Sequence, residues 1–288
     1  MFKTSLHIEK RKPVNIAHLD ICSSAFPVDL NNFRFVQLTD FHYGPWTKDS
    51  YIEAIIDLAL SLKPEFSVLT GDYIQVSPTG LRHYYKNELT LKRAPTVSYH
   101  RAGKDLISRF AQLLQPLSQC GPVYGVIGNH DYLEGKATIM RLLSKQVQWL
   151  INRTCLHRSK NFSLLLAGID DWKRGHPDLE QCQINTPQSD NNPVIKILLS
   201  HSPDISLSKD KALLSEYDLI LCGHTHGGQI CLPFNFPLIT CTKQRTHVRG
   251  LSYLDNIPLF VSTGLGWGGL KLRLFCPPEI TLITIKTR

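Results

Sequence analysis

The chain is organised around the stretch Leu221-Cys-Gly-His-Thr-His-Gly-Gly-Gln229, which continues a short apolar run that begins at Leu219. Such a run predicts a buried strand, and a strand directs the side chains of residues i and i+2 to the same face. His224 and His226 are therefore expected side by side at the strand end, where the glycines around them leave room for both rings. One His-x-His pair is only a weak indication of a metal site.

Four other segments place polar side chains of metal-binding types at the ends of apolar, strand-like runs. They are Thr39-Asp-Phe-His42, Thr70-Gly-Asp72, Gly128-Asn-His-Asp131 and Ser200-His201. Because ligands bind beyond the carboxyl ends of strands in α/β sheets, we expect these segments to meet. The candidate ligands are Asp40, His42, Asp72, Asn129, His201, His224 and His226. Carboxylate, amide and imidazole groups suit Mn, Fe, Co, Ni or Zn, and this set could serve two ions that share a carboxylate.

The apolar periodicity alternates between strands and helices along most of the chain. Strands are predicted at about 33–38, 66–69, 123–127, 164–168, 195–199 and 219–221. Helices are predicted from Ser50 to about Ala59, at 105–119, at 136–150 and near Ala212. We expect a strand and a loop before Leu30, a surface loop at 178–192, and strands at 270–274 and 280–285. This order indicates an α/β protein built on stacked sheets.

Composition agrees with a large core and an anionic partner. The chain has 288 residues, 42% of them hydrophobic, and a net charge of +8. The charge favours a phosphate-bearing substrate, a nucleic acid or an acidic membrane surface without choosing among them. The N-terminal segment has no apolar stretch of the roughly 18 residues that a membrane-spanning helix needs. The eight cysteines are scattered, which predicts reduced, mostly buried thiols in a cytosolic protein rather than a disulfide framework.

In their order, the five polar segments resemble the signature blocks of the calcineurin-like metallophosphoesterases. The resemblance runs from about residue 33 to residue 285. Its YkuE/YaeI-like branch is indicated by His226-Gly-Gly-Gln-Ile230, Leu232-Pro-Phe234, Ser262-Thr-Gly-Leu-Gly266 and Pro278-Glu-Ile280. The resemblance implies an α/β fold, a four-layer α/β/β/α sandwich, with residues 1–288 forming one domain.

The resemblance also implies a role for each candidate residue. One ion would be held by Asp40, His42 and His226, the other by Asn129, His201 and His224, and Asp72 would bridge them. His130 would assist without binding metal, by stabilising the transition state or by protonating the leaving oxygen. Asp131 would orient His130 through a hydrogen bond or, as the alternative, cap the next helix. Both ions are expected to be Mn, with Fe, Co, Ni or Zn possible.

The segment 76–104 makes the connection from Asp72 to Asn129 longer than one crossover helix needs. It mixes basic side chains with tyrosines and leucines, a combination that binds anionic membrane surfaces. We expect Arg82, Lys86 and Arg93 to bind substrate, with the segment forming a lid or a membrane contact. A solvated surface loop is the alternative.

The implied activity is metal-dependent hydrolysis of a phosphoester or phosphoanhydride. The branch is similar to pyrophosphatases that cleave UDP-2,3-diacylglucosamine, a lipid-linked sugar nucleotide, to UMP and 2,3-diacylglucosamine 1-phosphate in lipid A biosynthesis. This implies a cytoplasmic enzyme, peripheral on the inner membrane. The alternative is a general phosphodiesterase or phosphatase that acts on small soluble esters. A non-catalytic scaffold is disfavoured because no ligand position is replaced, and a nuclease because no nucleic-acid module is recognisable. No obligate protein partner is inferred.

Overall fold

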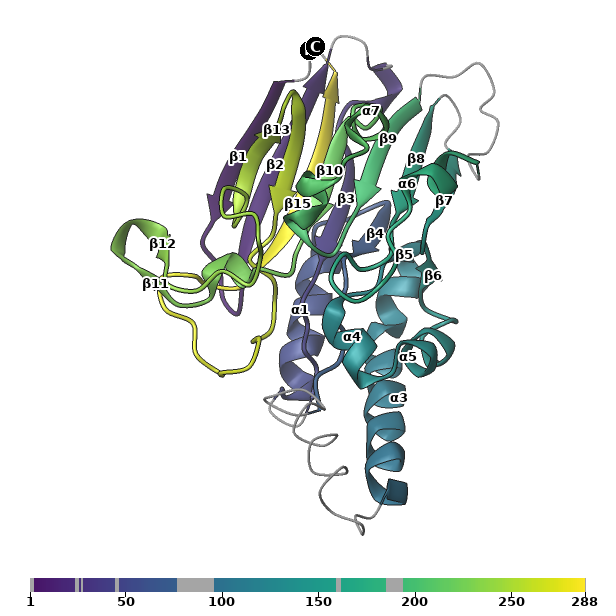
Figure 1. Ribbon diagram of the computed structural model, residues 1–288, viewed down its shortest axis with the longest axis vertical. Coiled ribbons are helices and arrows are strands. Elements are labelled where there is room, and N and C mark those ends of the chain that lie inside the picture. Colours follow the sequence, from purple (N-terminus) through teal and green to yellow (C-terminus); the bar gives the residue numbers. More distant parts are fainter. Residues whose placement is uncertain are drawn as a thin grey trace.

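Two large sheets form the centre of the molecule, a computed structural model shown in Figure 1. The structure describes residues 3–23, 26, 28–44, 47–76, 96–158, 162–184 and 194–287. In spatial order, the first sheet contains β1 (Lys3–Glu9), β2 (Asn15–Ser23), β15 (Glu279–Thr287), β3 (Phe33–Leu38), β4 (Phe66–Leu69), β5 (Val123–Gly125) and β6 (Gln148–Trp149). The second contains β13 (Gly250–Leu254), β14 (Ile257–Val261), β10 (Leu219–Cys222), β9 (Val194–Leu199), β8 (Ser163–Gly168) and β7 (Arg153–Arg158). A separate hairpin pairs β11 (Cys231–Leu232) with β12 (Phe236–Pro237).

Helices cover the outer face of each sheet. The first sheet is covered by α1 (Asp49–Ser61), α3 (Thr96–Cys120) and α5 (Lys136–Leu142), and the second by α6 (Leu179–Ile184) and α7 (Lys211–Leu214). The remaining helical elements are α4 (Asn129–Glu134), η1 (Val28–Leu30), η2 (Pro203–Leu207), η3 (His226–Gly228) and η4 (Pro233–Asn235). The predicted α/β/β/α sandwich is therefore confirmed.

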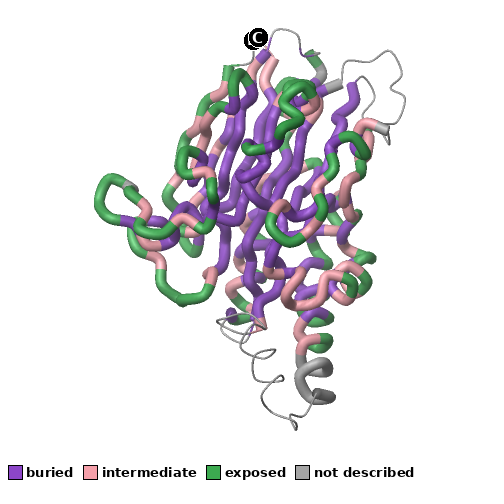
Figure 2. The backbone as a smooth tube through the Cα atoms, viewed as in Figure 1, coloured by how far each residue is buried: buried purple, intermediate pink, exposed green. Residues whose placement is uncertain are grey.

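Alternation along the strands sends apolar side chains into three layers of core, one between the sheets and one under the helices on each outer side. Buried residues run along the strands of both sheets (Figure 2). In β3, Val36 and Leu38 face the helices, whereas Phe35 faces the second sheet. Phe35 stacks on Phe66 of β4 with ring centroids 4.7 Å apart, and Leu221 of β10 joins the same cluster. Each such fully buried side chain contributes about 1.5–3 kcal/mol, so the region between the sheets holds them rigidly together.

The parallel strands β3, β4 and β5 of the first sheet and β8, β9 and β10 of the second end at the functional site. Among the residues that the structure describes, no helix combines the length and apolarity needed to cross a membrane. All eight cysteines are free, but only Cys182, Cys222, Cys231 and Cys276 are fully buried.

Two helix predictions were wrong in extent. The helix predicted at 105–119 begins earlier, at Thr96, so the end of the predicted insertion 76–104 is helical. The helix predicted at 136–150 ends at Leu142. Backbone N–H groups of Gln146 and Val147 both donate to the Leu143 carbonyl, which turns the chain so that β6 can pair with β5. Val147 and Trp149 are residue types that favour strands over helices.

Three further predictions need correction. The N-terminal segment forms two paired strands instead of one, and α6 forms within the predicted loop 178–192, of which 185–192 lies outside the described residues. The strand predicted at 270–274 does not form, apart from one bridge between Leu274 and Ile230. Its leucines alternate as in a strand, but Leu270, Leu272 and Leu274 are 69%, 52% and 45% exposed. Arg273 between them binds loop carbonyls instead of a sheet.

Candidate metal centre

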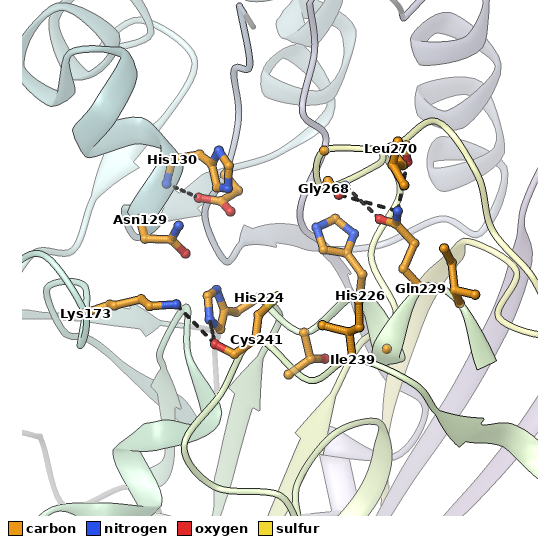
Figure 3. A pocket seen from close by; sticks show the side chains of 15 residues that line it. Asn129, His130, Lys173, His224, His226, Gln229, Ile239, Cys241, Gly268 and Leu270 are labelled. Carbon is orange, nitrogen blue, oxygen red and sulfur yellow. Dashed lines mark hydrogen bonds between the residues drawn. The ribbon is translucent and has the colours of Figure 1, made fainter. Parts of the chain in front are cut away.

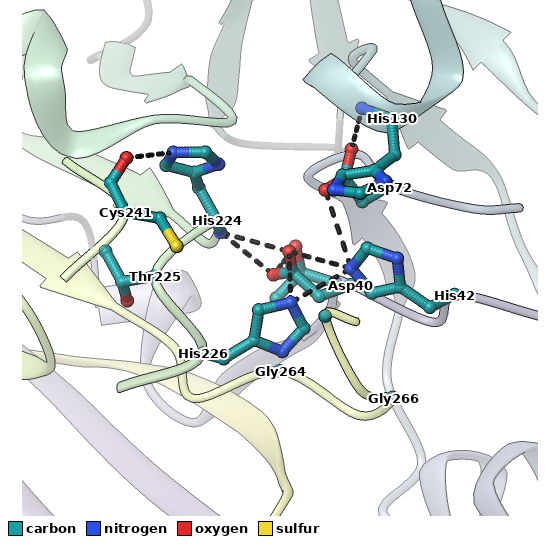
Figure 4. Close-up of polar contacts among 12 residues, drawn as sticks. Asp40, His42, Asp72, His130, His224, Thr225, His226, Cys241, Gly264 and Gly266 are labelled. Carbon is teal, nitrogen blue, oxygen red and sulfur yellow. Dashed lines mark hydrogen bonds and ion pairs between the residues drawn. The ribbon is translucent and has the colours of Figure 1, made fainter. Parts of the chain in front are cut away.

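Loops that follow strands of both large sheets bring the predicted ligands together (Figure 3, Figure 4). Their side chains form two groups, in each of which one ligand atom per residue lies within 4.8 Å of the others. The groups are Asp40, His42 and His226, and Asp72, His201 and His224. All six residues are buried. The two histidines of the His-x-His pair therefore serve different groups, although they are separated by one residue.

The carboxylate of Asp72 lies between the two groups. Its Oδ2 atom is 3.5 Å from Nε2 of His42 and 3.3 Å from Nε2 of His201. Asn129, the first residue of α4, extends the second group, because its Oδ1 atom lies 3.2 Å from Nε2 of His201. This arrangement places Asp72 where one carboxylate could serve two ions.

Backbone carbonyls fix the tautomers of two histidines. Nδ1 of His201 lies 2.7 Å from the Thr70 carbonyl, and Nε2 of His224 lies 3.0 Å from the Cys241 carbonyl. Since a carbonyl can only accept, these two ring nitrogens carry the protons. The opposite nitrogens, Nε2 of His201 and Nδ1 of His224, face each other across 3.1 Å, and both can offer a lone pair to a metal once no proton lies between them.

The donor set fits divalent cations. In the first group, Nε2 of His42 lies 2.9 Å from Nε2 of His226, so that two ring nitrogens are again directed at each other. Such a pair holds at most one proton in a hydrogen bond, and a cation bound between the rings would displace that proton and use the lone pairs of both nitrogens. Imidazole with carboxylate and amide oxygen is the combination that Mn, Fe, Co, Ni and Zn accept, and it contains no thiolate.

Backbone strain is concentrated at the candidate ligands. Five of them have positive φ angles: Asp40 (53°), His42 (44°), Asp72 (55°), His224 (72°) and His226 (50°). Each such conformation costs of order 1–3 kcal/mol for a residue with a side chain, and it persists where the surroundings enforce it. Two glycines allow the close packing: a Cβ on Gly223 would lie 2.4 Å from Asp40 Oδ2, and one on Gly128 would lie 2.2 Å from Asp72 Oδ1. The positive φ angles direct side chains from separate loops toward one place.

Burial and the charges of neighbouring side chains shift the pKa values of most titratable groups in the site. Burial lowers the pKa of His42 and of His224 to about 3, which keeps these imidazoles neutral and ready to bind metal. Burial also opposes protonation of His201, but the carboxylates of Asp72 and Asp40 outweigh it and raise its pKa to about 10. Burial raises the pKa of Asp40 to about 6. A cation in the site must therefore displace the proton from His201.

His130 lies beside the two metal-binding groups and belongs to neither of them (Figure 4). Its ring meets that of His42 edge to face at a centroid distance of 4.8 Å, and its backbone N–H donates to Oδ1 of Asp72 at 2.8 Å. Nδ1 of His130 is buried and has no hydrogen-bond partner in the structure. His130 also forms a three-residue cluster with His42 and Asp72, so its side chain is within reach of anything bound between them.

Asp131 does not orient His130, contrary to one of the predictions. Its Oδ2 atom accepts from the N–H groups of Asp72 (2.8 Å) and Gly128 (2.9 Å), and its Oδ1 atom accepts from that of Tyr73 (2.8 Å). The alternative prediction, capping of the next helix, is observed, because Gly128 immediately precedes α4. Burial and the Asp72 carboxylate raise the pKa of Asp131, and the backbone donors oppose that shift. Asp131 therefore clamps two ligand-bearing loops together.

A cavity of about 330 Å³ opens above the metal-binding groups (Figure 3). Asn129, His130 and His224 line one part, whereas Ile239 and Leu270 form an apolar wall. Lys173, on the loop after β8, also lines the cavity and donates to the Cys241 carbonyl at 3.2 Å. Asp171 holds the Lys173 loop in place by accepting from the backbone N–H groups of Lys173 and Arg174. Lys173 is thus a fixed positive charge at the mouth of the site.

Two of these residues were not predicted from the sequence. Lys173 belongs to no motif, and a single lysine in a loop carries no recognisable signal. Arg273 lies in the segment interpreted as a strand, yet its guanidinium donates to the carbonyls of Gly266 (2.6 Å) and Thr263 (2.8 Å) and lies 3.1 Å from Nδ1 of His226. Its position three residues before Cys276 gives no indication of this contact. Arg82, Lys86 and Arg93, predicted to bind substrate, lie outside the described residues.

Comparison with known proteins confirms the resemblance to the calcineurin-like phosphoesterases at the level of the family. The calcineurin-like phosphoesterase pattern matches residues 33–228. Escherichia coli K12 phosphodiesterase YaeI is 28% identical over 88% of this chain and 82% of its own length, and Bacillus subtilis metallophosphoesterase YkuE is 28% identical over 93% and 84%. A Campylobacter jejuni metallophosphoesterase, Cj0846, is 30% identical over 88% of this chain, which spans 59% of that relative's length.

Among solved structures, a dimetal phosphatase from Danio rerio aligns with 83% of this chain and 88% of its own, with a TM-score of 0.46 and 12% identity. The family pattern covers well over half of the chain and includes the loops that carry Asp40, Asp72, Asn129, His201, His224 and His226. The chain therefore belongs to the calcineurin-like phosphoesterase family, and it is a hydrolase of the metallophosphoesterase type.

Proposed function

We propose that the protein cleaves the pyrophosphate of UDP-2,3-diacylglucosamine and releases UMP and 2,3-diacylglucosamine 1-phosphate, as a step of lipid A biosynthesis. One observation carries the proposal: two metal-binding groups joined by Asp72 lie beneath a cavity that has an apolar wall and a lysine at its mouth. A substrate with both acyl chains and phosphates would use both features.

The proposed cofactor is a pair of divalent ions, with Mn as the first choice. Asp40, His42 and His226 would hold one, Asn129, His201 and His224 the other, and Asp72 both. Such a pair supplies Lewis-acid catalysis and an activated water for in-line displacement at phosphorus.

The protein's own side chains would supply binding and proton transfer. Lys173 would bind a phosphate oxygen through a charge-assisted hydrogen bond, which fixes the substrate at the cavity mouth. His130, with a ring nitrogen that has no partner, would donate a proton to the leaving oxygen and contribute roughly 10²–10⁴-fold to the rate.

Hydrolysis of small soluble phosphodiesters is the second candidate function. It is favoured by the Escherichia coli relative, which is named a phosphodiesterase and aligns with 88% of this chain. The two functions differ in the part that the apolar wall plays, since Ile239 and Leu270 have no role in binding a soluble diester.

We further propose that the protein works as one domain, peripherally on the cytoplasmic face of an inner membrane. The net charge of +8 supports attraction to anionic lipid. The single domain is supported by β15, which lies between β2 and β3, so that both ends of the described chain share a sheet. We propose neither specific nucleic-acid binding nor an obligate protein partner.

The test is an assay of the purified full chain with Mn²⁺ and UDP-2,3-diacylglucosamine in detergent micelles, with products identified by mass. Release of UMP and the diacylated sugar phosphate, lost in His130→Ala, is expected. If the lipid stays intact while bis-(p-nitrophenyl) phosphate is cleaved, the metal centre stands and the second candidate replaces the first.

A further inference from the structure

Exposed apolar side chains gather on two loops beside the metal centre. Thirteen large hydrophobic residues are exposed among the residues that the structure describes, and nine of them lie in these loops. We call these nine the apolar rim: Leu232, Phe234, Phe236, Leu238, Ile239, Leu270, Leu272, Leu274 and Phe275. Soluble proteins seldom expose so many large apolar side chains in one place without a binding function.

Hydrogen bonds join the two loops into one surface. The Cys231 N–H donates to the Leu274 carbonyl at 2.9 Å, and the Leu274 N–H donates to the Gln229 carbonyl at 3.0 Å. The Gln229 side chain reaches the Leu270 carbonyl at 2.8 Å and accepts from the Gly268 N–H at 2.8 Å. The rim is therefore a built feature, held by backbone contacts on both sides.

The hairpin of β11 and β12 carries the most exposed part of the rim and projects from the body of the molecule (Figure 1, Figure 2). At its tip, Phe234 is 100% exposed, and Phe236 is 66% exposed. Phe234 has a φ of 65°, a conformation that costs a bulky residue of order 1–3 kcal/mol. The chain thus accepts backbone strain to present an aromatic ring that has no contact within the fold.

The apolar rim is continuous with the cavity of the metal centre. Ile239 and Leu270 belong to both, since they are 67% and 69% exposed and also line the cavity with His130 and His224. A surface that covered the rim would therefore lie at the mouth of the site.

The charge around the rim selects an anionic partner. From residue 231 to residue 278 the only acidic residue is Asp255, in the turn between β13 and β14. Lys243, Arg245 and Lys271 lie in the same stretch and are exposed. Apolar side chains that insert, flanked by cations and with almost no carboxylates, fit the interface of an anionic bilayer.

We propose that the apolar rim inserts into an anionic lipid bilayer, which places the metal cavity against the phosphate-bearing headgroups. The apolar rim would be the surface that makes the membrane contact of the proposed function. This inference rests on the proposed function only for the identity of the substrate. A second copy of the chain could cover the apolar rim instead of a bilayer. The basic side chains beside the two rims would then repel each other.

The experiment is co-sedimentation of the full chain with vesicles of phosphatidylcholine alone or with phosphatidylglycerol. The test variant is Phe234→Ser/Phe236→Ser, and the matched control is Val28→Ser/Leu207→Ser, which removes two exposed apolar residues (81% and 44%) from other elements. Wild type and control should bind the anionic vesicles equally. The test variant should bind about a hundredfold more weakly or worse, because each of the two Phe side chains contributes more than about a factor of ten in transfer from water. Its turnover of bis-(p-nitrophenyl) phosphate should be unchanged.

The proposal is overturned if the wild type stays in the supernatant with phosphatidylglycerol vesicles, or if test variant and control bind equally. It is also overturned if the wild type forms a dimer by light scattering that the test variant loses, without vesicle binding. Failure of the lipid-substrate proposal is separate: vesicle binding with no cleavage of UDP-2,3-diacylglucosamine keeps the surface and rejects that substrate.

Discussion

Removing the Asp131 carboxylate should destabilise the protein although it leaves every candidate metal ligand in place. Asp131→Ala leaves the buried N–H groups of Asp72, Tyr73 and Gly128 without acceptors. An unsatisfied buried group costs about 1–3 kcal/mol, so the lower bound for three is about 3 kcal/mol. At roughly 2–4 °C per kcal/mol for a chain of this size, the expected fall in Tm is about 6–12 °C.

The assay combines thermal unfolding with metal analysis and steady-state kinetics. Asp131→Asn keeps one acceptor oxygen and should lose about half as much stability as Asp131→Ala, because its amide nitrogen must face at least one backbone donor. The control is Asp218→Ala, which removes a single bond from the Lys196 N–H (2.8 Å) at the opposite end of the strands. It should cost about 1 kcal/mol and leave bound metal and turnover unchanged.

The outcome separates two roles for Asp131. A clamp predicts that Asp131→Ala loses stability and metal together, because the Gly71–Asp72 loop is released from the loop that carries Asn129. If the variant instead melts within about 2 °C of the wild type, retains its metal and loses turnover as His130→Ala does, then Asp131 acts through His130 and the clamp is refuted.

Three further predictions test the site. Lys173→Ala should raise KM about tenfold or more with kcat unchanged, since a charged hydrogen bond to phosphate contributes about 1.5–3 kcal/mol; Lys209→Ala, another exposed lysine, should change neither constant. His130→Gln should lower kcat roughly 10²–10⁴-fold while the metal content measured by mass spectrometry stays at the wild-type value. Mn²⁺ affinity should rise with pH up to about 10, the raised pKa of His201, because the protonated ring competes with the cation; titration calorimetry that showed no pH dependence and no proton release would contradict this.

The fold and the clustering of the candidate ligands were predictable because both follow from local pattern. Asp40, Asp72 and His201 each end a short apolar run, and parallel strands carry their ends to one edge of a sheet. His224 and His226 follow the same rule, with glycines around them. What the pattern could not give is the positive φ of five ligands, since only the packed loops enforce it.

Long-range polar contacts were not predictable for the same reason. Asp131 looked like the partner of His130 because the two are adjacent in sequence, but its acceptors are used by Tyr73 and Asp72, 58 and 59 residues away. Lys173 reaches the cavity only because Asp171 folds its loop. The prediction of helix ends was wrong where strand pairing takes precedence over helix propensity. The helix α5 ends at Leu142 because the residues that follow it form β6, which pairs with β5.

The segment 270–275, of which 270–274 was predicted to be a strand, connects the apolar rim to the metal centre. Its alternation of leucine with basic residues is that of a strand, yet the leucines face outward as part of the apolar rim while Arg273 points inward. The Arg273 guanidinium binds the Gly266 carbonyl, and the Gly266 N–H donates to the Asp40 carbonyl at 2.6 Å. The rim is therefore connected through two hydrogen bonds to a candidate metal ligand, so a bilayer that orders this loop would also order the site. Substitutions at the hairpin tip leave that connection intact, which is why unchanged turnover of a soluble ester by Phe234→Ser/Phe236→Ser would separate docking from catalysis.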